Sequence, residues 1–138
     1  MEEEHYEMYE KLLKVNNLIS AQMHELFKNK EVTRSQYNVL KTLGDIYPNS
    51  CNAKYIKENI LVNAPDVTRL LDRLILKGLI VRKRDDVKRR QIEIKITKKG
   101  LDILGSMGSE ADFSIDNLQK VSLKEAKSLN KILGKILN

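Results

Sequence analysis

Several residue types are scarce in this chain, and each shortage excludes a class of protein. A single cysteine in 138 residues rules out an internal disulfide framework and points to a reducing compartment, so we expect a cytoplasmic protein. With 2 prolines and 6 glycines, the chain is neither collagen-like nor rich in linkers. No apolar run approaches the roughly 18–20 residues that span a bilayer. The start of the chain, MEEEH, is acidic where a signal peptide is basic and then apolar.

Motifs of catalysis and metal binding are missing as well. The sequence has no GxxxxGK[ST], GxGxxG or CxxC motif, and no paired carboxylates or nucleophile triad suggest an enzyme. His5, His24 and Cys51 do not have the spacing of a metal site. Cys51 falls in a short apolar stretch that suits a small buried side chain. We therefore expect no enzyme activity, no cofactor and no metal.

The positive charge of the chain is concentrated in one stretch. Residues 82–99 contain nine basic and three acidic residues, which equals the net charge of +6 of the whole chain. The other 120 residues hold 16 residues of each sign. A pI of about 9.4 suggests nucleic acid or an acidic membrane surface as a partner. Charge alone also allows a solvated loop, so the neighbouring elements must decide.

Apolar residues three and four positions apart predict helices along most of the chain. Capping boxes mark two helix starts, at Thr33 with Gln36 and at Ser122 with Glu125. The predicted helices cover about residues 3–28, 33–47, 53–60, 64–77, 98–119 and 123–137.

Single residues mark the other helix ends. Asn52 and Asn63 are the expected N-caps of the third and fourth helices, and Gly78 ends the fourth. The helix over 98–119 has a heptad-like apolar seam, and its Gly105 and Gly108 make sense if another helix packs close to it.

A β-hairpin is expected between the fourth and fifth helices. Residues 79–84 read as one strand, and in residues 91–96 three isoleucines, expected to be buried, alternate with three polar residues. Residues 85–90 form a charged turn, so the hairpin has a basic tip. A short helix, a turn and an amphipathic helix make a helix-turn-helix, whose second helix fits the major groove of DNA. The hairpin would be a wing beside this second helix. That position disfavours the interpretation of the basic stretch as a solvated loop.

The long terminal helices carry apolar stripes that one small core could not cover. A homodimer would cover them and place two recognition helices about 34–36 Å apart on a pseudo-palindromic operator. A larger bundle within one chain is the alternative.

Three motifs resemble the MarR family of winged-helix transcriptional regulators. Residues 67–74 (VTRLLDRL), followed by 77–80 (KGLI) and Arg82, are similar to its recognition helix and first wing strand, and residues 96–100 (ITKKG) to its exit from the wing. The resemblance implies a mainly α fold with a small β-hairpin wing (α+β). It would be a winged helix-turn-helix with long N- and C-terminal dimerisation helices. We expect one domain, 1–138, with the DNA-binding region in 32–100 and dimerisation helices in 1–30 and 101–138.

The resemblance also implies which residues meet DNA. Helix-start residues should face the groove, wing residues should reach the adjacent groove or phosphates, and two residues of the first motif helix should position the backbone. These candidates are Asn63, Ala64, Pro65, Asp66, Thr68, Arg69, Arg73, Arg84, Lys88, Arg89, Arg90, Asn52 and Lys54. Asp66 suits capping the helix or orienting an arginine better than touching DNA. Arg73 could bind phosphate or pair with carboxylates near Asp72.

One position departs from the family pattern. The family has an aspartate where this chain has Lys88, and that aspartate helps to orient the arginine equivalent to Arg90. Asp85 or Asp86 could compensate, or Lys88 could add a phosphate contact.

The resemblance predicts a dimeric repressor of double-stranded DNA, released by a small ligand in the crevice between the dimer helices and the winged domain. Alternatives are a protein-interaction module without DNA reading, and a redox-responsive regulator that uses Cys51.

Overall fold

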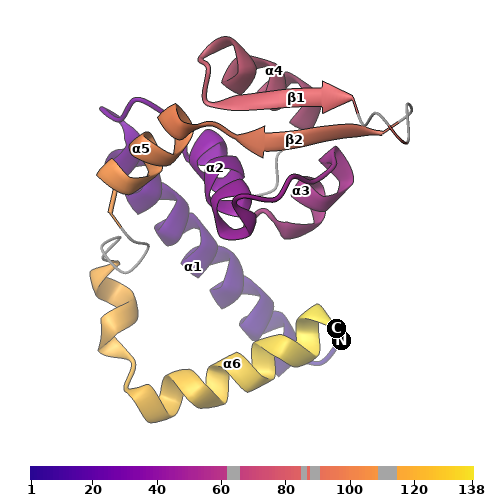
Figure 1. The fold of residues 1–138 in the computed structure, drawn as a ribbon. Helices are drawn as coiled ribbons and strands as arrows, with labels where there is room; N and C mark the ends of the chain where they lie inside the picture. Colours follow the sequence, from indigo (N-terminus) through magenta and orange to yellow (C-terminus); the bar gives the residue numbers. More distant parts are fainter. Residues whose placement is uncertain (62–65, 85–86, 88–90, 109–114) are drawn as a thin grey trace. The chain divides into compact units, whose positions relative to one another are not determined.

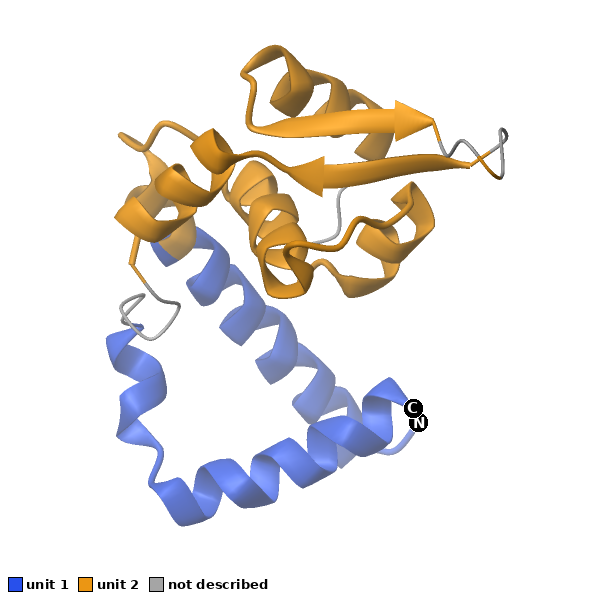
Figure 2. Ribbon diagram, viewed as in Figure 1, with its two compact units in different colours: residues 1–22, 111–138 blue, residues 23–110 orange. Residues whose placement is uncertain are grey.

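A computed structural model describes residues 1–61, 66–84, 87, 91–108 and 115–138 (Figure 1). Its elements in chain order are α1 (Glu3–Phe27), α2 (Arg34–Ile46), α3 (Ala53–Asn59), α4 (Val67–Leu76), β1 (Ile80–Arg84), β2 (Ile92–Ile96), α5 (Lys98–Ser106), the 3₁₀ helix η2 (Asp116–Lys120) and α6 (Leu123–Leu137). The structure is thus mainly helical with one antiparallel hairpin, which confirms the predicted fold class. The chain divides into two compact units, residues 1–22 with 111–138 and residues 23–110 (Figure 2).

The core of the second unit is built around α2. Val39, Leu40 and Leu43 of this helix have no exposed surface. α2 packs against α3, α4, α5 and β2, so all of these elements share one apolar centre. Ile56 of α3 and Leu74 of α4 are also fully buried there. Burying side chains of this size stabilises the unit by roughly 1.5–3 kcal/mol each.

The predicted helix caps are present at the start of α2, α3 and α6. The Thr33 hydroxyl accepts from the Gln36 amide at 3.1 Å, and the Gln36 side chain accepts from the Thr33 amide at 3.1 Å. Ser122 and Glu125 form the same reciprocal pair. Asn52 accepts from the Tyr55 amide at 2.9 Å. These bonds satisfy amides that have no partner inside the helix.

The hairpin has a definite register, and it corrects one expectation. Ile80 pairs with Ile96, Arg82 with Ile94 and Arg84 with Ile92. Ile94 and Ile96 are buried as predicted, but Ile92 is 39% exposed. The prediction of three buried isoleucines is therefore wrong at Ile92, which pairs with an exposed arginine at the far end of the hairpin.

The expected helix over 98–119 is wrong. α5 ends at Ser106, and Gly108 has a φ of +79°, a left-handed conformation that a right-handed helix cannot include. Residues 109–114 lie outside the described residues, and 116–120 form a 3₁₀ helix. Within the single chain, no described atom outside the neighbouring residues and backbone of α5 lies within 4 Å of a Cβ built at Gly105.

A close approach occurs instead at Gly100. A Cβ at this position would lie 2.3 Å from the Leu79 carbonyl oxygen and 2.7 Å from Ile96 Cγ1. The Thr97 amide also donates to the Leu79 carbonyl at 3.0 Å. The start of α5 is therefore pressed onto the start of the hairpin, which explains why glycine stands at position 100.

The first unit exposes much apolar surface. α6 has no buried residue, and apolar side chains of α1 are also exposed in the single chain. Those at least 38% exposed include Tyr6, Met8, Tyr9, Leu12, Leu13 and Val15 of α1 and Leu129, Ile132, Ile136 and Leu137 of α6. Within the described residues, no helix is both long and apolar enough to cross a membrane.

Candidate nucleic-acid interface

The helix α4 presents a polar face opposite a buried one. Val67, Leu71 and Leu74, spaced four and three residues apart, are buried against the rest of the second unit. Thr68, Arg69, Asp72 and Arg73 are exposed. The apolar spacing of the sequence therefore leaves the candidate DNA-contacting side chains Thr68, Arg69 and Arg73 on the outside.

Asp66 is the N-cap of α4. Its φ of −126° and ψ of 82° lie outside the helical region, and its carboxylate accepts from the Arg69 amide at 3.0 Å. The described helix begins at Val67, so Asp66 caps it, as one of the two expectations for this residue had it, and does not lie in its first turn; the other expected cap, Asn63, lies outside the described residues. Asn63, Ala64 and Pro65, three of the predicted contact residues, lie outside the described residues.

Two arginines of α4 line a shallow depression. Arg69 and Arg73 are four residues apart and border it together with Asp66, Leu70 and the N-terminal turn of α2, contributed by Thr33, Ser35 and Gln36. Its volume is about 370 Å³. Neither arginine belongs to an ion pair among the described residues. The two guanidinium groups are therefore available for an outside acceptor.

An ion pair joins the hairpin to α4. The Arg82 Nη2 atom lies 2.7 Å from Asp72 Oδ1, with both side chains about half exposed. Asp72 thus pairs with Arg82 and not with Arg73. Arg82 is not among the predicted contact residues. The sequence could have indicated that Arg82 faces the protein, because strand alternation puts Arg82 on the same face as the buried Ile80 and Ile94.

The described part of the wing has one predicted contact residue. Arg84 ends β1 and is exposed. Lys88, Arg89 and Arg90 lie outside the described residues, so the structure does not place the other predicted wing contacts.

The first motif helix contributes two candidates. The side-chain oxygen Oδ1 of Asn52 accepts the cap bond from the Tyr55 amide, which leaves the side-chain NH₂ group as a donor. Lys54 is exposed, and its Nζ lies 3.9 Å from Glu58 Oε1. A pair of this length between exposed side chains contributes little, so Lys54 can still bind an anion.

The environment of Cys51 suits a core residue. Its side chain is buried, and its backbone exchanges hydrogen bonds with Ile94 at 3.0 and 2.7 Å. Burial, with a smaller effect of the negative Glu93, raises the pKa of the Cys51 thiol to about 11. The thiol is therefore protonated at neutral pH, whereas reaction with oxidants requires the thiolate. The redox-responsive alternative is therefore not favoured at this cysteine.

The sequence of this region is similar to that of known proteins. The family model for the MarR family matches residues 32–92, which run from the start of α2 to the start of β2. The transcriptional regulator MgrA of Staphylococcus aureus is 29% identical over 133 residues, covering 96% of this chain and 86% of the relative. By these matches, this chain resembles the MarR family.

Solved MarR-family structures share the fold. A mutant MarR from E. coli complexed with operator DNA has a TM-score of 0.82 and 22% identity, covering 98% of this chain and 96% of that one. BpsR of Bordetella bronchiseptica, whose DNA binding is regulated by 6-hydroxynicotinic acid, has a TM-score of 0.77 and 18% identity, covering 94% of this chain and 91% of that one. The winged helix-turn-helix fold of this chain is thereby confirmed.

Proposed function

We propose that this protein is a sequence-specific double-stranded DNA-binding transcriptional regulator, a homodimeric repressor that a small ligand releases from its operator. The observation that carries the proposal is the outer face of α4. It offers Thr68, Arg69 and Arg73 beside a basic hairpin, on a fold that also occurs with operator DNA. The proposal places the protein in the cytoplasm, where it would reach DNA, and assigns it no catalytic activity.

The side chains of α4 have chemistry suited to the major groove. Arg69 can donate two hydrogen bonds to the O6 and N7 atoms of guanine, and Thr68 can bond a base edge or a phosphate. Arg73, one turn further along, suits a phosphate. Asn63, Ala64 and Pro65 precede the helix and complete the proposed groove contacts.

The wing supplies positive charge next to this helix. Arg84, with Lys88, Arg89 and Arg90 beyond it, would lie along phosphates or enter the adjacent minor groove, where a narrow groove has strong negative potential. The hairpin packs against α4 through β1, and the Arg82–Asp72 ion pair also joins the two proposed DNA-contacting elements. Asn52 and Lys54 would fix the backbone of the first motif helix.

Homodimer formation would cover the exposed apolar side chains of α1 and α6. So many exposed apolar side chains on two helices favour an interface there. Residues 1–30 and 101–138 are proposed to supply it, within one domain of 1–138. A two-fold dimer presents two copies of α4, so the operator should be a pseudo-palindrome.

The test is selection of bound sequences from random duplexes, followed by affinity measurement at several salt concentrations. We expect specific binding that weakens steeply with salt, because neutralised phosphates release counterions. Arg69→Ala should weaken specific binding by about 10-fold or more, since a bidentate base contact contributes roughly 1–3 kcal/mol. Lys57→Gln, at an exposed lysine of α3 that belongs to neither the proposed DNA contacts nor the proposed dimer segments, is the control. Weak, sequence-independent binding even at low salt would instead support a protein-interaction module.

A further inference from the structure

The C-terminal end of α4 is held by the side chain of its own last residue. Lys77 is the C-cap of this helix, and its Nζ atom donates to the side-chain oxygen of Gln36 at 3.0 Å and to the carbonyl of Glu31 at 3.0 Å. The two acceptors lie 41 and 46 positions earlier in the chain, so both bonds are tertiary contacts. They join the end of α4 to the start of α2 and to the segment that precedes it.

The start of α5 holds the same end of α4. The Lys99 Nζ atom donates to the Lys77 carbonyl at 3.0 Å, and the Thr97 hydroxyl donates to the Gly78 carbonyl at 2.8 Å. The last carbonyls of a helix have no partner inside it, and the helix dipole favours a cation beside them. The end of α4 is therefore fixed by four side-chain hydrogen bonds to other segments of the second unit.

Gln36 connects these bonds to the candidate interface. Its side chain is 4% exposed, and its Oε1 atom accepts from the Thr33 amide at 3.1 Å as well as from Lys77. One oxygen thus belongs to the capping box of α2 and to the contact with α4. Thr33 and Gln36 also border the depression that Arg69 and Arg73 line. Loss of the Lys77 bonds would therefore change how the two arginines lie beside the start of α2.

Lys77 continues the row of cations on α4 but has different contacts. Arg69, Arg73 and Lys77 are spaced four residues apart, so they lie along one side of the helix. The two arginines belong to no ion pair among the described residues. The Lys77 ammonium has three donors, and two of them already have acceptors in the protein. The position of this ammonium is therefore set by the protein and not by DNA.

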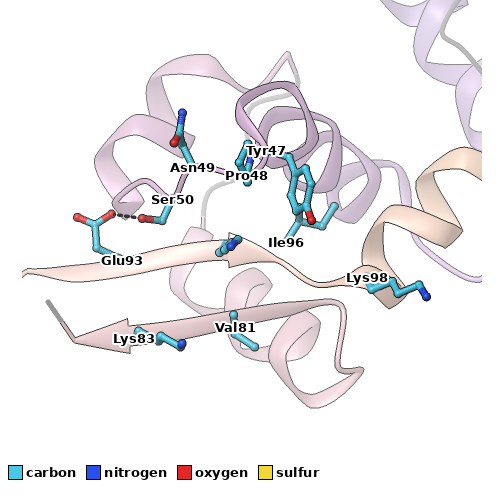
Figure 3. Close-up of a pocket in the computed structure, with 10 residues that line it drawn as sticks. Tyr47, Pro48, Asn49, Ser50, Val81, Lys83, Glu93, Ile96 and Lys98 are labelled. Atoms are coloured by element: carbon cyan, nitrogen blue, oxygen red, sulfur yellow. Dashed lines mark hydrogen bonds between the residues drawn. The ribbon is translucent and has the colours of Figure 1, made fainter.

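Two other lysines of the basic stretch lack such contacts. Lys83 and Lys98 border a hollow of about 660 Å³ on the outer face of the hairpin, opposite the buried isoleucines (Figure 3). Among the described residues, neither side chain forms an ion pair or donates a hydrogen bond. Lys98 is exposed and extends from the start of α5 away from the strands (Figure 3). It is therefore a matched control, a lysine beside Lys99 that does not hold α4.

We propose that Lys77 is a positioning residue for DNA recognition, which fixes the direction in which α4 presents Arg69 and Arg73 to the major groove. The 10 residues of α4 span about 15 Å, so a rotation of about 10° at the held end moves the other end by about 2.6 Å. Hydrogen bonds to base edges need donor–acceptor distances of roughly 2.7–3.2 Å, which such a movement disrupts. The inference rests on the proposed DNA-binding function and assigns Lys77 a part in it without contact to DNA.

The first test compares Lys77→Met with Lys98→Met on the selected operator and on an unrelated duplex, at several salt concentrations. Lys77→Met should weaken operator binding at least about fivefold, because base contacts are misaligned. Its salt dependence and its binding to the unrelated duplex should match the wild type, since no phosphate contact is lost. Lys98→Met should bind both duplexes within about twofold of the wild type.

Two results of this comparison would overturn the proposal. If Lys77 bound phosphate, Lys77→Met would weaken binding to both duplexes alike and reduce the salt slope by about 1. If Lys77 had no role, Lys77→Met would bind the operator as tightly as Lys98→Met does.

The second test needs no DNA and uses amide NMR spectra of the ¹⁵N-labelled full chain. Lys77→Met should shift the amides of Thr33 and of residues 73–78, whereas unchanged amides in α3 verify the fold. Lys77→Gln, whose shorter side chain lacks the ammonium, should shift the same amides. Unshifted amides in both variants would refute the role of Lys77, even if the wild type bound no duplex specifically and the proposed function failed. Specific binding by the wild type that Lys77→Met leaves intact would refute only the role of Lys77.

Discussion

Two substitutions of Asp66 distinguish its role as the N-cap of α4 from a direct contact with DNA. The Asp66 carboxylate accepts from the Arg69 amide at 3.0 Å, at the end of the helix proposed to enter the major groove. Asp66→Ala removes this acceptor, whereas Asp66→Asn retains an oxygen that can cap the helix but has no charge. The pair therefore distinguishes the hydrogen bond from the charge.

The expected loss on Asp66→Ala is about 1 kcal/mol of unfolding free energy, the usual cost of losing an N-cap. For a chain of this length, that corresponds to a fall in Tm of roughly 3–5 °C. Asp66→Asn should cost less, about 0.5 kcal/mol, because aspartate loses only its favourable charge at the helix N-terminus. Calorimetry at one fixed protein concentration checks both values, since the stability of a dimer depends on concentration.

DNA affinity gives the second readout. Asp66→Asn should bind the operator at least as tightly as the wild type, because it removes a negative charge near phosphates. Asp66→Ala should bind less tightly than Asp66→Asn, because the first turn of α4 loses its cap. Equal stability of all three proteins would refute the capping role. A loss of more than about 10-fold in the affinity of Asp66→Asn would show that the carboxylate reads a base.

The remaining predictions concern packing, redox chemistry and the wing. Gly100→Ala should destabilise the protein by about 2–3 kcal/mol, because the new Cβ would lie 2.3 Å from a backbone oxygen. Gly105→Ala, a helix position with open space, should stabilise it by roughly 0.5–1 kcal/mol; thermal unfolding compares the two. The raised pKa of Cys51 keeps its thiol protonated, so alkylation by iodoacetamide should be slow at pH 7 and accelerate toward pH 11. For the same reason, peroxide should have the same effect on DNA binding by the wild type and by Cys51→Ser. A peroxide response lost in Cys51→Ser would contradict this. At the wing, Arg90→Ala should weaken operator binding more than Lys88→Ala in a titration, and equal or reversed losses would argue against the wing-tip role of Arg90.

Local patterns in the sequence were sufficient for most of the elements. The capping boxes at Thr33 and Ser122 fix helix starts through contacts three residues apart, and such contacts are visible in the chain itself. The apolar spacing of residues 67–74 likewise predicted both the buried and the exposed face of α4. The family motifs lie in the same region, so the fold and the recognition helix could be identified without coordinates.

The same local patterns were wrong where the outcome depends on backbone conformation. Apolar residues three and four apart suggested one helix over 98–119, but spacing carries no information about the left-handed conformation that Gly108 adopts. Alternation likewise cannot say where a hairpin passes beyond the core, so Ile92 was expected to be buried and is exposed. At α4, two possible caps lay three residues apart in the sequence, and the backbone angles and hydrogen bond of Asp66 identify it as the cap of the described helix.

The sequence by itself determined a basic winged helix-turn-helix, because helix periodicity, caps and charge clustering are local properties. Only the tertiary structure decided which distant residues meet. Asp72 and Arg82 pair because the chain turns back at Gly78 and lays β1 against α4. Tyr47 and Lys95, 48 positions apart in the sequence, meet because the loop after α2 lies over the outer face of the strands. Such contacts depend on how the elements pack, and the spacing of residues along the chain does not encode the distance between residues on different elements.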